Sequence, residues 1–189
     1  MNITSAQFVK GIVGPDPSLN DGFPQIAFIG RSNVGKSSVI NALTGKPGLA
    51  KTSSFPGRTQ QINLFLINKA FYLVDLPGYG FAKVSKERKA EIEHLVNWYF
   101  FDSTTEQKKV VLIIDANIGP TKDDLEMLYS LDKNNKNVVI LANKVDKVKK
   151  SLYTAQIEKI QEMVGMHTMI PFSAEKRMGI QELVKEMGN

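Results

Sequence analysis

The stretch QIAFIGRSNVGKSSVINALTG, residues 25–45, decides the fold. It opens with an apolar run typical of a buried strand, turns through GRSNVGKS at residues 30–37, and continues with the apolar spacing of a helix. A strand, a G-x-x-x-x-G-K-[ST] loop and a helix in this order predict a phosphate-binding loop, in which backbone N–H groups and the helix dipole surround an anion. Lys36 would place its ammonium at the phosphates, and Ser37 would offer a hydroxyl to Mg²⁺.

Apolar runs and helical segments alternate along the rest of the chain, which favours strands joined by helical crossovers. Strands are expected at 25–30, 62–67, 71–75, 109–115 and 137–143, with a weaker one at 168–173, and helices at 36–43, 85–101, 121–131, 151–163 and 180–187. Only three residues separate 62–67 from 71–75, so this pair should be an antiparallel hairpin. The sequence therefore predicts an α/β domain with a mostly parallel six-stranded sheet, one antiparallel strand, and helices on both faces.

The length of 189 residues suits one domain, with residues 24–189 as that domain and 1–23 as an N-terminal extension packed on it. The chain has no cysteine, which excludes disulfides and zinc–thiolate sites. No apolar stretch approaches the roughly 18 residues of a membrane-spanning helix. We expect a cytoplasmic, monomeric protein without a membrane partner.

Two short motifs after later strands extend the nucleotide hypothesis. In DLPG, residues 75–78, Asp75 ends an apolar strand and can hold a Mg²⁺ shell, while the Gly78 N–H can reach a γ-phosphate. In NKVD, residues 143–146, the Asp146 carboxylate can accept the N1 and N2 hydrogens of guanine, a donor pair that adenine lacks. Asn143 and the stem of Lys144 would support the ring.

Two further elements complete the expected site. The Ala174 N–H in SAEK, residues 173–176, can meet guanine O6. A switch threonine is needed between the first helix and the second strand, and Thr52 and Thr59 are candidates; we favour Thr59 because Pro56 and Gly57 precede it and a strand follows.

The candidate residues fall into three overlapping groups. Lys36, Thr59 and Gly78 are assigned to catalysis, and Ser37, Thr59 and Asp75 to Mg²⁺. The nucleotide-binding set is Gly30, Arg31, Ser32, Asn33, Val34, Gly35, Lys36, Ser37, Ser38, Gly57, Arg58, Thr59, Asp75, Leu76, Pro77, Gly78, Asn143, Lys144, Val145, Asp146, Ser173, Ala174 and Glu175.

Taken together, GRSNVGKSS, PGRTQQIN, DLPGYGFAKVSK, DANIGPTKDDLEM, NKVD and SAEK resemble the EngB/YihA family of translation-factor-class GTPases. The resemblance runs from Pro24 to the end of the chain. DLPGYG leading into AKVSK, and GPT-x-x-D-x-E-M after Asp115, are its most distinctive parts. An additional RNA-binding KH domain, as in Era-like proteins, has no room in this chain.

The resemblance implies a Ras-like domain that binds GTP with Mg²⁺, hydrolyses it slowly, and acts in assembly of the large ribosomal subunit, with a link to cell division and septation. The net charge of +5 agrees with a ribosomal RNA or protein partner. Lysine and arginine gather in short clusters, and we select Lys83, Lys86, Arg88 and Lys89 as the contact, although such clusters are commonly plain solvated surface.

Several positions leave alternatives open. Tyr79 stands directly after D-x-x-G, where many small GTPases carry a water-orienting Gln. Asn33 matches an asparagine that some relatives use to hold K⁺, or it only shapes the loop. Arg31 and Arg58 are candidates for arginine fingers supplied by the chain itself to stabilise charge during hydrolysis. The simpler interpretation is that each orients phosphate or lies at the surface. The aromatic run 98–101 is expected to pack in the core rather than bind RNA.

Two rival functions remain at this point. A binding module whose nucleotide only stabilises the fold would bind its partner equally well with GDP and with a GTP analogue. An ATP-dependent P-loop kinase or ATPase is disfavoured by NKVD and by the lack of an evident lid for a second substrate.

Overall fold

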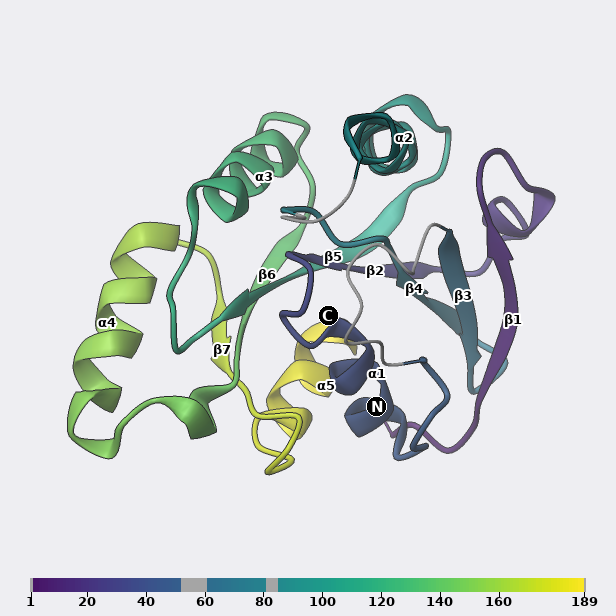
Figure 1. The fold of residues 1–189 in the computed structure, drawn as a ribbon. Coiled ribbons are helices and arrows are strands. Elements are labelled where there is room, and N and C mark those ends of the chain that lie inside the picture. Colours follow the sequence, from purple (N-terminus) through teal and green to yellow (C-terminus); the bar gives the residue numbers. More distant parts are fainter. Residues whose placement is uncertain (1, 52–60, 81–84, 189) are drawn as a thin grey trace.

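A single sheet with helices on both sides organises the chain (Figure 1). This is a computed structural model, and it describes residues 2–51, 61–80 and 85–188. The strands lie in the order β1-β3-β4-β2-β5-β6-β7. They span β1 Ala6–Ile12, β2 Gln25–Gly30, β3 Ile62–Ile67, β4 Phe71–Asp75, β5 Gln107–Asp115, β6 Val138–Asn143 and β7 Met169–Pro171.

Helices alternate with most of these strands along the chain, and α5 follows the last strand. They span α1 Lys36–Thr44, α2 Lys86–Asn97, α3 Lys122–Lys133, α4 Tyr153–Val164 and α5 Ile180–Gly188, with short 3₁₀ turns at Pro17–Leu19, Val145–Lys147 and Lys150–Leu152. The helix expected over 85–101 is divided, because α2 ends at Asn97 and a π-helical turn, Trp98–Asp102, follows it. Tyr99 and Phe100 of that turn are fully buried, so the aromatic run packs in the core as expected.

The predicted α/β class and mostly parallel sheet are confirmed, and the sheet has seven strands rather than six. β3 runs antiparallel to β4, as the short hairpin requires, and it also pairs antiparallel with β1. β1 comes from the N-terminal extension, with Ala6 opposite Ile67 and Ile12 opposite Ile62. A bulge between Phe8 and Lys10 interrupts the register of this edge strand.

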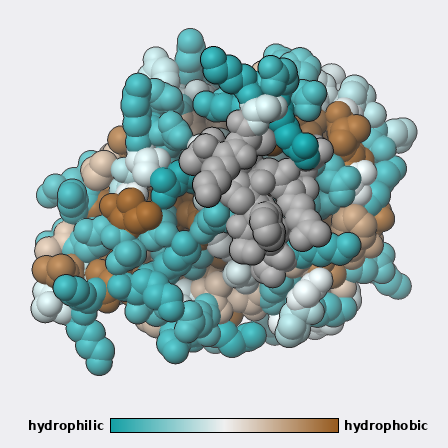
Figure 2. Space-filling model, viewed as in Figure 1, coloured by the Kyte–Doolittle hydropathy of each residue, from teal (hydrophilic) through white to brown (hydrophobic). Residues whose placement is uncertain are grey.

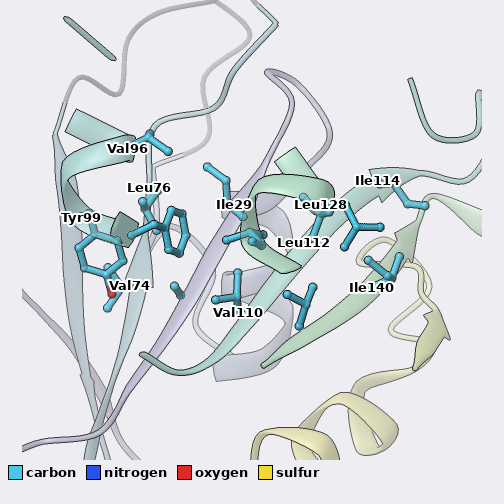
Figure 3. Packing of buried hydrophobic residues seen from close by; sticks show 14 of the residues in the cluster. Ile29, Val74, Leu76, Val96, Tyr99, Val110, Leu112, Ile114, Leu128 and Ile140 are labelled. Carbon is cyan, nitrogen blue, oxygen red and sulfur yellow. The ribbon is translucent and has the colours of Figure 1, made fainter. Parts of the chain in front are cut away.

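Two apolar layers hold the helices on the sheet. Alternate side chains of β2 point to opposite faces: Ala27 and Ile29 join the layer under α2, α3 and α4, while Ile26 and Phe28 join the layer under α1 and α5. Figure 3 shows Ile29, Val110 and Leu112 packed side by side in the first layer. A central strand buried on both faces explains why its sequence is a continuous apolar run.

The surface contrasts with these layers. On the face seen in Figure 2, hydrophilic side chains predominate and hydrophobic ones form small separate groups. Within the described parts of the chain, none of the helices combines the length and apolar character needed to cross a bilayer.

Two neighbouring lysines of β5 attach the C-terminal helix to the sheet. Lys109 is only 4% exposed, and its Nζ donates to the Glu186 carbonyl oxygen at 2.6 Å and contacts the Glu186 carboxylate at 3.3 Å. Lys108 Nζ donates to the Gly188 carbonyl oxygen, but its side chain is exposed. A cation at a helix C-terminus satisfies free carbonyls and meets the negative end of the dipole.

Because Lys109 is buried, its loss should leave a desolvated carbonyl and carboxylate without their cation. We expect Lys109→Ala to lower the free energy of unfolding by about 2–3 kcal/mol, measured by urea denaturation. Lys108→Ala removes the exposed neighbour and should cost less than about 0.5 kcal/mol. Equal effects of the two substitutions would contradict this account of how α5 is attached.

Candidate functional site

The phosphate-binding loop between β2 and α1 has the backbone that its two glycines permit. Gly35 has φ of 100°, and a Cβ there would lie 2.6 Å from the Asn143 side-chain nitrogen. A Cβ on Gly30 would collide with the Ile113 carbonyl oxygen of β5. Asn33 also has a positive φ, of 64°. The loop is therefore packed tightly against β5 and β6, and α1 starts at Lys36, directly after Gly35.

The carboxylate of Asp75, at the end of β4, is buried beside this loop. Asp75 is 3% exposed, and its Oδ1 is buried without a hydrogen-bond partner among the described residues. The Nζ of Lys36 lies 3.9 Å from this oxygen. Burial raises the pKa of Asp75 above its ordinary value, and the attraction of Lys36 only partly opposes this. An anionic oxygen in such surroundings favours a cation ligand.

Gly78 brings the D-x-x-G segment onto the phosphate loop. A Cβ there would lie 3.0 Å from the Ser32 nitrogen and 3.1 Å from the Gly30 carbonyl oxygen. Leu76 and Pro77, which join it to Asp75, are buried. The carboxyl ends of β2 and β4 thus place Lys36, Asp75 and Gly78 around one loop, as the parallel pairing of these strands requires.

The NKVD residues after β6 attach to the same loop through side-chain hydrogen bonds. Asn143 Nδ2 donates to the Val34 carbonyl oxygen at 2.9 Å, and Asn143 Oδ1 accepts from the Ala174 N–H at 3.3 Å. Lys144, with φ of 68°, donates from Nζ to the Asn33 carbonyl oxygen at 2.8 Å. GRSNVGKS, NKVD and SAEK therefore form one contiguous site.

Asp146, the residue assigned to guanine, is held as an ionised acceptor. Its Oδ1 accepts from the Ser173 hydroxyl at 2.6 Å, and its Oδ2 lies 3.2 Å from Lys147 Nζ. Burial alone would raise the pKa of Asp146, but the hydrogen bonds from Ser173 and Lys147 outweigh it and hold the pKa below its ordinary value. Lys147 also pairs with Glu175 at 2.7 Å, which ties SAEK to NKVD.

Other candidates stand less centrally or lie outside the described residues. Ser37 and Ser38 occupy the first turn of α1, half-buried and exposed, respectively. Arg31 forms an isolated parallel bridge with Tyr79, and Val145, the third residue of NKVD, is buried. Thr52, Gly57, Arg58, Thr59 and Lys83 fall outside the described residues.

The structure adds two residues that the motifs did not supply. Asp115, at the end of β5, has its Oδ2 2.7 Å from Lys144 Nζ and so orients that lysine. Lys147, directly after NKVD, bridges Asp146 and Glu175. An aspartate that ends a buried strand is the same signal that selected Asp75, and it was available for Asp115; nothing in the pattern distinguished Lys147 from its neighbouring lysines.

Two family models match the chain. The model described as "50S ribosome-binding GTPase" matches residues 25–144, and the model described as "Elongation factor Tu GTP binding domain" matches residues 102–189. The first covers more than half of the chain, including the phosphate loop, D-x-x-G and the start of NKVD. The two matches together reach the C-terminus.

Curated bacterial relatives match over nearly their full length. A "Probable GTP-binding protein EngB" of Clostridium perfringens (strain 13 / Type A) is 44% identical over 97% of this chain and 94% of its own. Proteins with the same description from Geobacillus sp. (strain WCH70) and Acholeplasma laidlawii (strain PG-8A) are 41% and 40% identical; these matches cover 96% and 98% of this chain and 95% and 97% of theirs.

Solved structures agree with these matches. A crystal structure of a probable GTP-binding protein engB superposes with a TM-score of 0.72 at 27% identity, over 87% of this chain and 96% of that one. A structure of Era in complex with MgGDPNP and nucleotides of 16S ribosomal RNA gives a TM-score of 0.68 at 25% identity, over 87% of this chain and 55% of that one. The resemblance seen in the motifs is confirmed: the chain belongs to the EngB family of GTP-binding proteins and is a GTPase.

Proposed function

We propose that this GTPase works with Mg²⁺ as a nucleotide-dependent switch in assembly of the large ribosomal subunit, as a monomer in the bacterial cytoplasm. The observation that carries the proposal is the buried Asp75 carboxylate beside Lys36 and the phosphate loop, an arrangement suited to a cation and phosphates together. The cell-division link implied by the family resemblance would follow from this role.

Guanine selection is assigned to Asp146. Its lowered pKa keeps the carboxylate ionised near neutral pH, so both oxygens can accept the N1 and N2 hydrogens of guanine. Ser173 and Lys147 fix the position of the carboxylate before any base arrives. Lys144, oriented by Asp115, would cover one face of the ring. An adenine base offers neither of these hydrogens, so the carboxylate would make no hydrogen bonds to the base.

The residues present fit Mg²⁺. Asp75 offers an oxygen that lacks a partner among the described residues, and the first turn of α1 offers the Ser37 hydroxyl; Thr59 is assigned as the third ligand. When bound, Mg²⁺ would neutralise charge on the β- and γ-phosphates. Three or more clustered His, Asp or Glu side chains are not found in the described parts of the chain, and a site of one carboxylate and hydroxyls does not require them.

Hydrolysis would rest on electrostatics around the γ-phosphate. Lys36 supplies an ammonium, and the N–H groups of the loop and of Gly78 supply further donors. Tyr79 replaces the water-orienting Gln, so the Asn33 side chain, exposed on the loop, remains the candidate for a K⁺ ion that adds positive charge. Arg31 and Arg58 remain candidates for orienting phosphates.

A ribosomal partner is supported by the family model and by charge. The matching model is described as ribosome-binding, and the Era structure contains ribosomal RNA. In this chain the exposed Lys86, Arg88 and Lys89 lie in the first turns of α2, directly after the D-x-x-G region. A basic surface next to a nucleotide-dependent segment would bind polyanionic RNA in one nucleotide state more strongly than in the other.

The guanine assignment predicts the result of calorimetric titration with Mg²⁺ and GDP, a GTP analogue or ADP. Wild type should bind both guanine nucleotides and not ADP. Asp146→Ala should weaken guanine binding at least about 100-fold, because N1 and N2 lose a charged acceptor. Asp132→Ala, an aspartate on α3 paired with His167, serves as the control and should bind normally. Tight binding of ADP, or an unchanged affinity of Asp146→Ala for guanine nucleotides, would overturn the assignment.

The cation assignment predicts that removing the charge of Asp75 stabilises the nucleotide-free protein and weakens the stabilisation by Mg²⁺ with GDP. The folded-state pKa of Asp75 is raised, so its ionised form costs stability above that pKa, and the cost disappears as pH falls and the group protonates. At pH 7, Asp75→Asn should therefore raise the Tm of the nucleotide-free protein by about 2–4 °C. The gain in Tm from Mg²⁺ with GDP should be smaller in Asp75→Asn than in wild type. The assignment would be contradicted if Asp75→Asn had a lower Tm than wild type without nucleotide and the same gain in Tm from Mg²⁺ with GDP.

The ribosomal role predicts nucleotide-dependent cosedimentation with large-subunit precursors. Binding should be stronger with a non-hydrolysable GTP analogue than with GDP. The triple variant Lys86→Glu, Arg88→Glu, Lys89→Glu should lose at least about tenfold in affinity while keeping GDP affinity. Lys133→Glu, Lys149→Glu, Lys150→Glu makes the same change of charge elsewhere and should bind like wild type. Equal affinity with the two nucleotides would favour the binding module without a switch.

A further inference from the structure

A tyrosine directly after D-x-x-G is joined to a helix far away in the sequence. The Tyr79 hydroxyl donates to Asp124 Oδ1 at 2.7 Å. Asp124 lies in the first turn of α3 and is only 3% exposed. This contact links DLPGYG and GPTKDDLEM, the two most distinctive stretches of the sequence, and the nucleotide-binding roles assigned above do not account for the second of them.

The position of the Asp124 carboxylate is also set by hydrogen bonds that do not involve Tyr79. Its other oxygen, Oδ2, accepts from the Thr121 N–H at 2.8 Å and from the Thr121 hydroxyl at 2.7 Å. The Thr121 side chain in turn accepts from the Asp124 N–H, which makes a capping box at the start of α3. The hydroxyl therefore meets an acceptor whose position is set by the helix end.

The backbone on the other side of Tyr79 is attached to the phosphate loop. The Tyr79 carbonyl oxygen accepts from the Ser32 N–H at 2.8 Å. Gly80, with φ of 68°, is so close to Arg31 that a Cβ would meet its Cγ at 2.8 Å. Residues 78–80 are thus held between the phosphate loop and α3, with the Gly78 N–H belonging to a segment fixed at both sides.

The Tyr79 phenol remains a donor at working pH. Burial raises its pKa well above the ordinary value, and the neighbouring Asp124 raises it further, while Arg31 opposes both only weakly. The contact is therefore a constant hydrogen bond to a charged acceptor, the stronger kind in proteins.

We propose that Asp124 is a positioning residue for GTP hydrolysis, because it holds the Tyr79 hydroxyl and so keeps Gly78 against the phosphate loop. The proposal rests on the role assigned above to Gly78 at the γ-phosphate. GDP has no γ-phosphate, so the hydrogen bond affects hydrolysis of GTP and leaves GDP affinity nearly unchanged. Tyr79 thereby serves as an anchor at a position where other small GTPases use a side chain to orient water.

The test compares single-turnover GTP hydrolysis with GDP affinity in Tyr79→Phe, which removes one hydroxyl and leaves the capping box intact. The rate should fall about tenfold, and GDP affinity should stay within threefold. Asp124→Ala should lower the rate at least as much, and the double variant should fall no further than Asp124→Ala alone, because the Tyr79 hydroxyl has then already lost its acceptor. Additive losses in the double variant would show that Asp124 does not act through Tyr79.

A second tyrosine provides a matched control. The Tyr72 hydroxyl donates to Asp21 Oδ2, also at 2.7 Å, but joins β4 to the N-terminal extension. Tyr72→Phe should keep the wild-type rate, whatever its cost in Tm. A Tyr79→Phe rate within twofold of wild type, or an equal loss in Tyr72→Phe, would overturn the proposal. A wild-type protein that turns over no GTP would instead refute the assigned hydrolytic site itself, so the two failures are distinguishable.

Discussion

The amide side chain of Asn143 is the contact on which the arrangement of the site depends. Its nitrogen holds the phosphate loop through the Val34 carbonyl oxygen, and its oxygen holds the SAEK loop through the Ala174 N–H. The residue is 2% exposed, so both bonds are shielded from competing water. A Cβ on Gly35 would lie only 2.6 Å from the same nitrogen, so this position of the amide requires a glycine there. The loops assigned to phosphate and to base are therefore held together by one side chain.

A buried charge is the cost of this arrangement. Asp75 ends an apolar strand in a place where burial disfavours its ionised form, and Lys36 at 3.9 Å compensates only in part. A core optimised for stability would place an apolar residue there. The buried carboxylate therefore lowers the free energy of unfolding. A cation bound to Asp75 together with nucleotide would offset this cost and stabilise the folded protein.

Sequence patterns predicted most of the central sheet, because strands buried on both faces are continuous apolar runs that are easily seen in the sequence. The runs 25–30, 62–67 and 71–75 coincide with β2, β3 and β4. β1 was missed, because it is an edge strand with only Ala6 and Ile12 buried and with Gln7, Phe8 and Val9 exposed. Neither alternation nor a continuous apolar run marks such a strand.

The candidate site divides in the same way. Residues joined by local spacing, such as Lys36 in the phosphate loop and Asp146 in NKVD, could be selected as candidates from the sequence because each motif carries its own chemistry. Asp115 beside Lys144 and Asp124 beside Tyr79 were not, since these pairs form only after distant elements meet. The assignment of Thr59 stays a prediction, as it lies outside the described residues.

The pairing of β1 with β3 also has a consequence during synthesis, because β1 is made well before its partner strand. Ile12 is opposite Ile62 and Ala6 is opposite Ile67, so β1 has no β3 partner during synthesis until fifty or more further residues follow. At about 5–20 residues per second, that interval is roughly 3–12 s. During it, Phe8 and its neighbours are exposed on an unpaired segment. Once β1 is paired in the folded protein, the bulge between Phe8 and Lys10 disfavours regular pairing of this edge strand with a neighbouring chain, so the irregularity protects the sheet edge that pairing with β3 leaves open.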